Sequence, residues 1–229
     1  PVRIPHLAKL NTKIAVSATI ILLVVGTVAI AIIEWNGAVA GMSVTDKLVH
    51  SFFNATTPRT AGFNSVSTNQ FSLLTLILYI ILMWIGGASQ STAGGIKVNT
   101  FVVAFASFMS TVRDEKSVTM FNRTITDKSV KRAYATIFGS VMVIIICFVT
   151  LVIIEPKITA FDLLFETISA LSTVGVSMGI TASLTTASKI LVSAMMFVGR
   201  VGLITEAMSL FASREHRHYQ LPEDNVIIN

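Results

Sequence analysis

Charged residues are scarce in this chain. Of its 229 residues, 13% are charged and 53% are hydrophobic, whereas a typical soluble domain has about 25% charged residues. Two stretches, 14–33 and 133–154, contain no charged residue at all. About 20 helical residues cross the roughly 30 Å hydrocarbon layer of a membrane. We therefore expect two transmembrane helices here; the alternative, buried helices of a large soluble protein, rarely involves uncharged runs of this length.

The chain also lacks cysteine clusters and nucleotide-binding motifs. Its single cysteine, Cys147, lies in an apolar stretch and is interpreted as a packing residue, because it has no partner for an intrachain disulfide. No Gly-x-x-x-x-Gly-Lys-Ser/Thr motif occurs, so ATP control would have to come from a partner. We expect neither an enzyme nor an organic cofactor. The first residue is Pro1 rather than methionine, and we expect the chain to start inside a longer protein. The histidines are not part of a recognisable metal-ligand cluster: His6, His50, His216 and His218.

The basic residues occur mainly in three places. They precede the first apolar stretch (Arg3, Lys9, Lys13), fill one polar connector (Arg113, Lys116, Arg123, Lys128, Lys131, Arg132) and follow the last apolar stretch (Arg214, Arg217). The positive-inside rule predicts a multi-pass protein of the inner (plasma) membrane, with both termini of this segment and the connector in the cytoplasm. A nucleic-acid patch is the alternative for the connector, but its acidic residues dilute the charge, and no nucleic-acid partner is expected.

The two halves of the chain repeat one pattern. A shift of 113 residues places Gly175 on Gly62 and Thr173 on Thr60, and such internal repeats are informative about architecture. Each half reads as an apolar span, a short semi-polar helix, a Thr-x-Gly turn and a second apolar span. Capping-box patterns begin the short helices at Ser43-x-x-Asp46 and Thr159-x-x-Asp162.

The short helices are too short to span a bilayer, so we expect them to enter the membrane and the chain to return. Exposed backbone at that depth is tolerated only where it lines a cavity or is buried in protein. The helix C-termini carry partial negative charge, and the turn carbonyls can replace the hydration shell of a cation. Glycine supplies a turn conformation that is closed to other residues. The pattern predicts a cation filter, with a simple packing turn as the alternative.

A second interruption lies at 86–95, in the long uncharged run between Phe71 and Lys97. The segment has four glycines around a polar centre, which makes a poor helix interior. We expect a loop that gates the pathway below the filter; a polar contact between helices through small residues is the alternative. The expected gate residues are Gly86, Gly87, Ala88, Ser89, Gln90, Ser91, Thr92, Ala93, Gly94 and Gly95.

Arg200 is the repeat counterpart of the first residues of this loop, because 87 plus 113 is 200. A charge inside a span is unfavourable unless it is paired, and it is functional by default. We expect Arg200 to contact the 86–95 loop and to close the pore with it. A pairing of Lys97 with Glu206 is a weaker hypothesis.

Four motifs together resemble the Trk/Ktr/HKT superfamily of potassium transporters, most closely its bacterial Ktr-type membrane subunit. They are NATTPRTAGFN, GGASQSTAGGIK, ETISALSTVGVSMG and FVGRVGLIT. The resemblance implies an all-α integral membrane fold, in which span–pore helix–filter loop–span units surround a pseudo-fourfold pore. This chain resembles the third and fourth units, so the N-terminal half with the other two filter walls is a missing partner.

The resemblance also implies the roles of individual residues and partners. One filter wall would be Thr60, Ala61, Gly62 and Phe63, and another Thr173, Val174, Gly175 and Val176. Potassium is the implied substrate, bound at filter carbonyls only, and sodium remains open as a coupling or activating ion. The implied partners are membrane lipid, a second copy of the full-length subunit and a cytoplasmic nucleotide-binding ring.

The expected organisation follows from these assignments. Residues 1–110 form the third unit, 111–132 the cytoplasmic connector, 133–213 the fourth unit and 214–229 a cytoplasmic tail. Arg59 has two readings: it structures the filter loop by bonding neighbouring carbonyls, or it sits at the outer mouth.

Potassium uptake by the pore-forming subunit is the leading function. The alternatives are the potassium-translocating subunit of a P-type ATPase complex, a passive membrane scaffold, and an intramembrane serine protease that would use Ser89 with His50.

Overall fold

The computed structural model describes residues 10–201 except Gln90, Thr92 and Lys116. The expected tail 214–229, Glu206, Arg3 and Lys9 lie outside the described residues. Two long helices dominate the described part, α1 (Leu10–Glu34) and α5 (Asp127–Ile154). Both are long and apolar enough to cross a membrane, and only 22% and 11% of their most apolar windows are buried. Side chains such as Ile32 of α1 and Ile153 of α5, each 73% exposed, would face lipid, and this arrangement does not suit core helices of a soluble protein.

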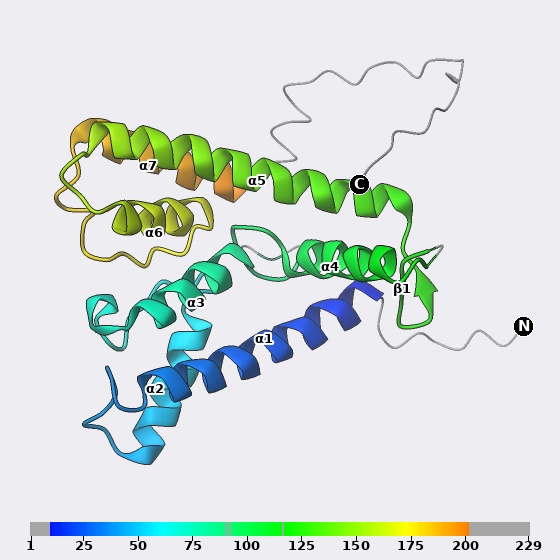
Figure 1. Ribbon diagram of the computed structural model, residues 1–229, viewed down its shortest axis with the longest axis horizontal. Helices are drawn as coiled ribbons and strands as arrows, with labels where there is room; N and C mark the ends of the chain where they lie inside the picture. The colour runs from blue at the N-terminus through cyan, green and yellow to red at the C-terminus, as the bar shows by residue number, and fades with distance from the viewer. Residues whose placement is uncertain (1–9, 90, 92, 116, 202–229) are drawn as a thin grey trace, which may run out of the picture.

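Each long helix is followed by a short helix, a loop and a further helix. In the first half these are α2 (Val44–Thr56), the 3-10 turn η1 (Thr68–Gln70), α3 (Leu73–Trp84) and α4 (Val98–Val112); in the second half they are α6 (Ala160–Leu171) and α7 (Thr186–Val201). Helix α3 packs against α6 and α4 against α5, so these pairs join the halves. Figure 1 shows that α1 and α5 begin at the same end of the molecule, near β1, and run in the same direction.

The connector departs from the expected all-α class. Strands β1 (Thr119–Met120) and β2 (Arg123–Thr124) form a small antiparallel hairpin in which Met120 pairs with Arg123. The two residues between them, Phe121 and Asn122, have φ of 49° and 58°, as the twist of a two-residue hairpin loop requires. The connector is also shorter than the range 111–132, because α5 already begins at Asp127.

The largest buried cluster lies where the two halves meet. It contains residues of the first half, such as Tyr79 and Met83, together with residues of the second, such as Phe165, Val174 and Val176. A separate cluster inside the second half joins α5, α6 and α7 through Leu151, Leu163 and Val192 among others. Apolar packing therefore holds the second Thr-x-Gly turn, through Val174 and Val176, against the first half of the chain.

Candidate functional site

The two short helices begin with the predicted side-chain caps. The Ser43 hydroxyl accepts a hydrogen bond from the Asp46 amide at 3.2 Å and donates to its carboxylate at 2.7 Å. The Thr159 hydroxyl accepts from the Asp162 amide at 3.4 Å. Both predicted N-caps are confirmed. The caps hold α2 and α6 with their C-terminal ends, which carry partial negative charge, at the Thr-x-Gly turns.

Both Thr-x-Gly turns have the same unusual backbone. Gly62 and Gly175 have φ of 77° and 87°, as the glycine argument predicts, and Thr60 and Thr173 also lie in the left-handed region with φ of 70° and 51°. A positive φ is a genuine outlier for a β-branched residue and is typical of functional sites. Two such outliers at equivalent positions show that each turn is held in a specific, strained conformation.

Hydroxyl groups near the ends of the short helices hold these turns. Thr57 Oγ1 donates to the Phe63 carbonyl at 2.7 Å, and the buried Ser169 Oγ donates to the Val176 carbonyl at 2.6 Å. Phe63 and Val176 are the last residues of the two expected filter walls, and their carbonyls are thus directed to the helices behind. The sequence contained a signal for this, since Ser and Thr near a helix end compete for nearby backbone groups.

The two turns lie directly against each other. A Cβ added at Gly62 would lie 2.4 Å from the Val174 carbonyl oxygen, so only glycine allows the approach. A Cβ at Gly175 would meet no atom within 4 Å. In addition, the hydroxyl of Thr173 is buried without a hydrogen-bond partner among the described residues. The structure brings the two expected walls side by side and leaves the Thr173 hydroxyl of the second turn without a hydrogen-bond partner among the described residues.

The segment between α3 and α4 is a loop closed at its base. Gly86 N donates to Ile96 O at 2.8 Å, Ile96 N to Trp84 O at 3.1 Å, and Val98 N to Gly87 O at 3.0 Å. The amine of Lys97 donates to the carbonyls of Ser91, at 3.2 Å, and Ala93. The backbone hydrogen bonds hold the two ends of the loop together. Gln90 and Thr92, which belong to the expected gate, lie outside the described residues.

The 86–95 loop reaches the second Thr-x-Gly turn. A Cβ added at Gly94 would lie 2.2 Å from the Thr173 hydroxyl oxygen and 2.6 Å from the Ser172 carbonyl oxygen. Gly95 has φ of 69° and approaches the Ser172 side chain. Glycine at these positions lets the loop lie against the turn without a side chain between them.

The two arginines of the site both lie close to this loop. Arg59 Nη2 donates to the Gly86 carbonyl at 3.2 Å and to Thr19 Oγ1 at 3.4 Å. The partner carbonyl therefore belongs to the 86–95 loop and not to the Thr-x-Gly turn next to Arg59. Arg200, on α7, lies near enough to Lys97, at the end of the loop, for the two positive charges to repel each other.

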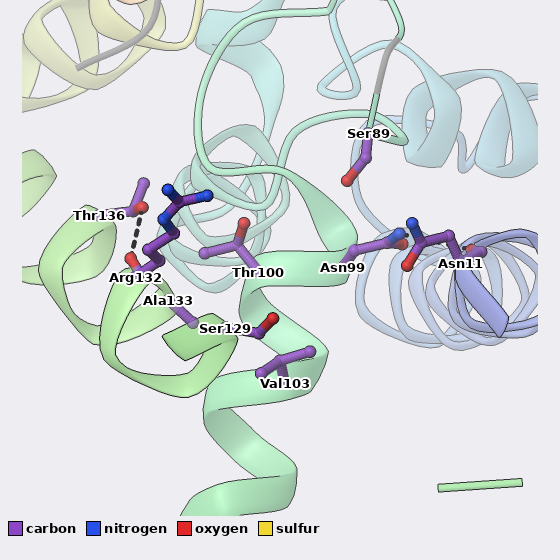
Figure 2. A pocket seen from close by; sticks show the side chains of 9 residues that line it. All are labelled: Asn11, Ser89, Asn99, Thr100, Val103, Ser129, Arg132, Ala133 and Thr136. Carbon is purple, nitrogen blue, oxygen red and sulfur yellow. Dashed lines mark hydrogen bonds between the residues drawn. The ribbon is translucent and has the colours of Figure 1, made fainter. Parts of the chain in front are cut away.

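A cavity of about 350 Å³ lies beside the loop. Figure 2 shows Ser89 on one side of it and residues of α1, α4 and α5 around the rest: Asn11, Asn99, Thr100, Val103, Ser129, Arg132, Ala133 and Thr136. His50 is not among them and contacts Ser65 instead, 3.0 Å from Nδ1 to Oγ. The Ser89–His50 pair that the protease alternative requires is therefore not formed. No group of three or more possible metal-ligating residues was found in the described part of the chain.

Two buried glutamates are an unpredicted feature of the site. Glu34, at the end of α1, accepts hydrogen bonds from the Ser72 amide (2.9 Å) and hydroxyl (2.7 Å) and from the Thr75 hydroxyl. Glu155, just after α5, accepts bonds of 2.7 Å from the Thr185 amide and the Ser188 hydroxyl. Each carboxylate thus caps the helix that follows a filter loop, α3 or α7.

Comparisons with known proteins identify the family to which the chain belongs. The family model described as "TrkH: Cation transport protein" matches residues 4–218. The chain belongs to this TrkH family. With the two long apolar helices, membership of a family of cation transport proteins supports a membrane location.

Several relatives in the TrkH family carry potassium uptake names. The chain is 36% identical over 219 residues to the Ktr system potassium uptake protein B of Bacillus subtilis strain 168 (95% of this chain, 49% of the relative). It is 38% identical over 225 residues to the protein of that name in Vibrio alginolyticus (97% and 49%). It is 35% identical over 225 residues to the potassium/sodium uptake protein NtpJ of Enterococcus hirae (96% and 50%). The chain spans about half the length of these relatives.

The fold agrees with a solved TrkH structure. The crystal structure of the potassium transporter TrkH from Vibrio parahaemolyticus has a TM-score of 0.74 to this chain at 16% identity, over 86% of this chain and 44% of that chain. At this identity the likeness concerns the fold alone. The predicted resemblance to the Trk/Ktr superfamily is confirmed by the family match and by the Ktr relatives.

Proposed function

We propose that this chain is part of a potassium uptake protein and contributes two of four filter walls to its pore. The observation that supports this best is the juxtaposition of the two Thr-x-Gly turns, with Gly62 against the Val174 carbonyl and a threonine at positive φ in each. Each turn follows a helix whose C-terminal end favours a cation. Backbone oxygens at that depth replace the water of a dehydrated ion. The Ktr relatives named for potassium uptake point to the same ion.

The proposed pore also includes parts that lie outside this chain. The filter would be formed by Thr60, Ala61 and Gly62 with Thr173, Val174 and Gly175, and closed by two further walls from outside this chain. The pseudo-fourfold arrangement, the cytoplasmic termini in the plasma membrane, the homodimer and the nucleotide-binding ring remain part of the proposal. The Enterococcus relative, whose name includes sodium, supports testing sodium as a second ion.

Ion flux with the full-length protein tests this function. The protein that contains this chain is reconstituted in liposomes, and uptake of radioactive rubidium is measured with potassium or sodium as competitor. We expect rubidium uptake that potassium suppresses and equal sodium does not. Absence of uptake by correctly inserted protein would refute the proposal.

The proposed gate consists of the 86–95 loop and Arg200. The loop lies against Ser172 and Thr173, directly next to the second turn. The positive charges of Arg200 and Lys97 repel each other, and Lys97 donates a hydrogen bond to the Ser91 carbonyl of the loop. A fixed cation beside a potassium pathway is an electrostatic barrier, and its removal lowers that barrier.

Replacing Arg200 with alanine should therefore raise flux. We expect faster rubidium uptake per molecule for Arg200→Ala than for the wild type, and unchanged uptake for the control Arg113→Ala, whose side chain is exposed on the connector. Equal uptake by Arg200→Ala and wild type, at equal abundance, would sink the gating role of Arg200.

A further inference from the structure

We propose that Arg59 is a positioning residue that couples the first filter loop to the 86–95 loop, so that the positions of the two change together. This inference rests on the proposed function and assigns to Arg59 a part in it. Its basis is the hydrogen bond between the Arg59 guanidinium and the Gly86 carbonyl, which joins residues 27 positions apart in the sequence.

The contact lies at the base of the loop. Gly86 N donates to the Ile96 carbonyl, and this bond closes the loop. Gly86 O accepts from Arg59 Nη2 at 3.2 Å. Gly86, two residues after the end of α3, is thus hydrogen-bonded both to Ile96 at the other end of the loop and to Arg59, the residue before Thr60. A displacement of the loop base would pull on the filter turn.

Arginine suits this role better than any other residue. The charge is half-buried among helices that we assign to the membrane, where it is unfavourable and therefore expected to have a function. One nitrogen reaches two acceptors, Gly86 O and the Thr19 hydroxyl of α1. The other terminal nitrogen, Nη1, is buried without a partner among the described residues. Hydrogen bonds from a single nitrogen contribute a small enough free energy to break and form again when the loop moves.

The other end of the loop touches the other filter turn. Gly94 lies against the Thr173 hydroxyl and the Ser172 carbonyl. The loop therefore contacts both filter turns, through Arg59 at its base and through Gly94 near its other end. A loop movement that opens the pathway must change at least one of these contacts, so gate position and filter geometry are linked.

The test uses the full-length protein with native cysteines replaced, including Cys147→Ser, and a reporter Ser91→Cys on the exposed part of the loop. Two quantities are measured in proteoliposomes: the rate at which a membrane-impermeant thiol reagent modifies the reporter, and the ratio of potassium to sodium flux. The variants are Arg59→Met, which removes the donors, and Arg59→Lys, which keeps a charge but loses the fork. The control is Arg113→Met, an exposed arginine on the connector.

We expect Arg59→Met to change the modification rate and to lower the flux ratio, each by about fivefold or more, within the usual range of coupling between sites. Arg59→Lys should be intermediate, and Arg113→Met should match the wild type in both. A change in only one of the two quantities, or in neither, overturns the coupling. A loss of abundance with wild-type rate and ratio in the remaining protein would assign Arg59 a purely structural role and also overturns it.

Two possible failures of the experiment, a variant that does not insert and a wild type without flux, still give an outcome. If Arg59→Met does not insert into the membrane, Arg59→Lys is judged by the same two quantities. If the wild type shows no potassium flux, the proposed function fails, and the reporter rate alone still shows whether Arg59 restrains the loop.

Discussion

At the scale of single residues, hydrogen bonds from the short helices fix each proposed filter turn. Thr57 and Ser169 donate from the ends of α2 and α6 to the carbonyls of Phe63 and Val176. Positive φ at Thr60 and Thr173 is maintained by these surroundings, because such a conformation does not persist unless neighbouring contacts enforce it.

Removal of the Thr57 hydroxyl tests this support. We expect the nearly isosteric Thr57→Val to lower the stability by about 1–3 kcal/mol, because the Phe63 carbonyl loses its buried donor. Thermal unfolding in detergent measures the effect. The adjacent Thr56→Val is the control, since the Thr56 hydroxyl bonds only the Phe52 carbonyl of its own helix, at 2.9 Å. Equal unfolding midpoints for the two variants would contradict the supporting role.

At the scale of elements, the carboxylate caps join each first span to the helix after its filter loop. The pKa of Glu155 is lowered chiefly by the hydrogen bond from the Thr185 amide, with further bonds from Thr185 and Ser188 and the charge of Lys189 in the same direction, although burial opposes them. A carboxyl group with a lower pKa in the folded state stabilises the fold above its unfolded pKa. This stabilisation is lost as the pH falls through the lower, folded value.

Glu155→Gln should therefore be less stable than the wild type near pH 7, with a difference that shrinks below about pH 4.5, the ordinary value for this group. Unfolding midpoints in detergent as a function of pH measure the difference. Glu115→Gln, which changes an exposed carboxylate on the connector, should show little difference at any pH. A constant gap between Glu155→Gln and wild type across the acid range would exclude the carboxylate cap.

The 86–95 loop gives a second prediction for an element. In Gly94→Ala the new methyl group would meet the Thr173 hydroxyl and the Ser172 carbonyl, so the loop must move away from the filter, and we expect rubidium flux to rise several-fold. Gly139→Ala is the matched control, because its Cβ would meet nothing within 4 Å on α5 and alanine is the better helix former by about 1 kcal/mol. Flux of Gly94→Ala at or below the wild-type level would contradict a closing role for the loop.

The sequence predicted those elements that depend on local chemistry. The apolar runs, the capping boxes and the 113-residue shift led to α1, α5 and the caps of α2 and α6, and the glycine-rich run marked the break between α3 and α4. The sequence-based account missed contacts between distant residues, such as Glu34 with Ser72 and Arg59 with Gly86. One signal for the caps was present: Ser72 and Thr75 shifted by 113 give Thr185 and Ser188, and each pair follows a span that ends in glutamate. Glu34 shifted by 113 falls on Cys147 rather than on Glu155, so the simple repeat did not reveal the pair of glutamates.

At the scale of the whole molecule, two similar halves pack through α3 with α6 and α4 with α5 (Figure 1). The apolar cluster between them includes Val174 and Val176 and so supports the filter turns from the protein interior. A Cβ atom added at Gly175 would meet no atom of the described residues within 4 Å, so there is open space beside this residue. A pore with four walls requires two more such turns, and the relatives, of which this chain spans about half, are long enough to supply them.

The potassium-to-sodium flux ratio of Gly175→Ser, compared with wild type in liposomes with the full-length protein, tests the central claim most directly. Serine fits the open space at Gly175, but its side chain strains a backbone with φ of 87°, at about 1–2 kcal/mol for a left-handed conformation. Because this strain moves the Gly175 backbone away from the geometry in which its carbonyls replace the water of the ion, we predict that the ratio falls. An unchanged ratio in well-inserted Gly175→Ser protein would contradict the assignment of these turns as the potassium filter.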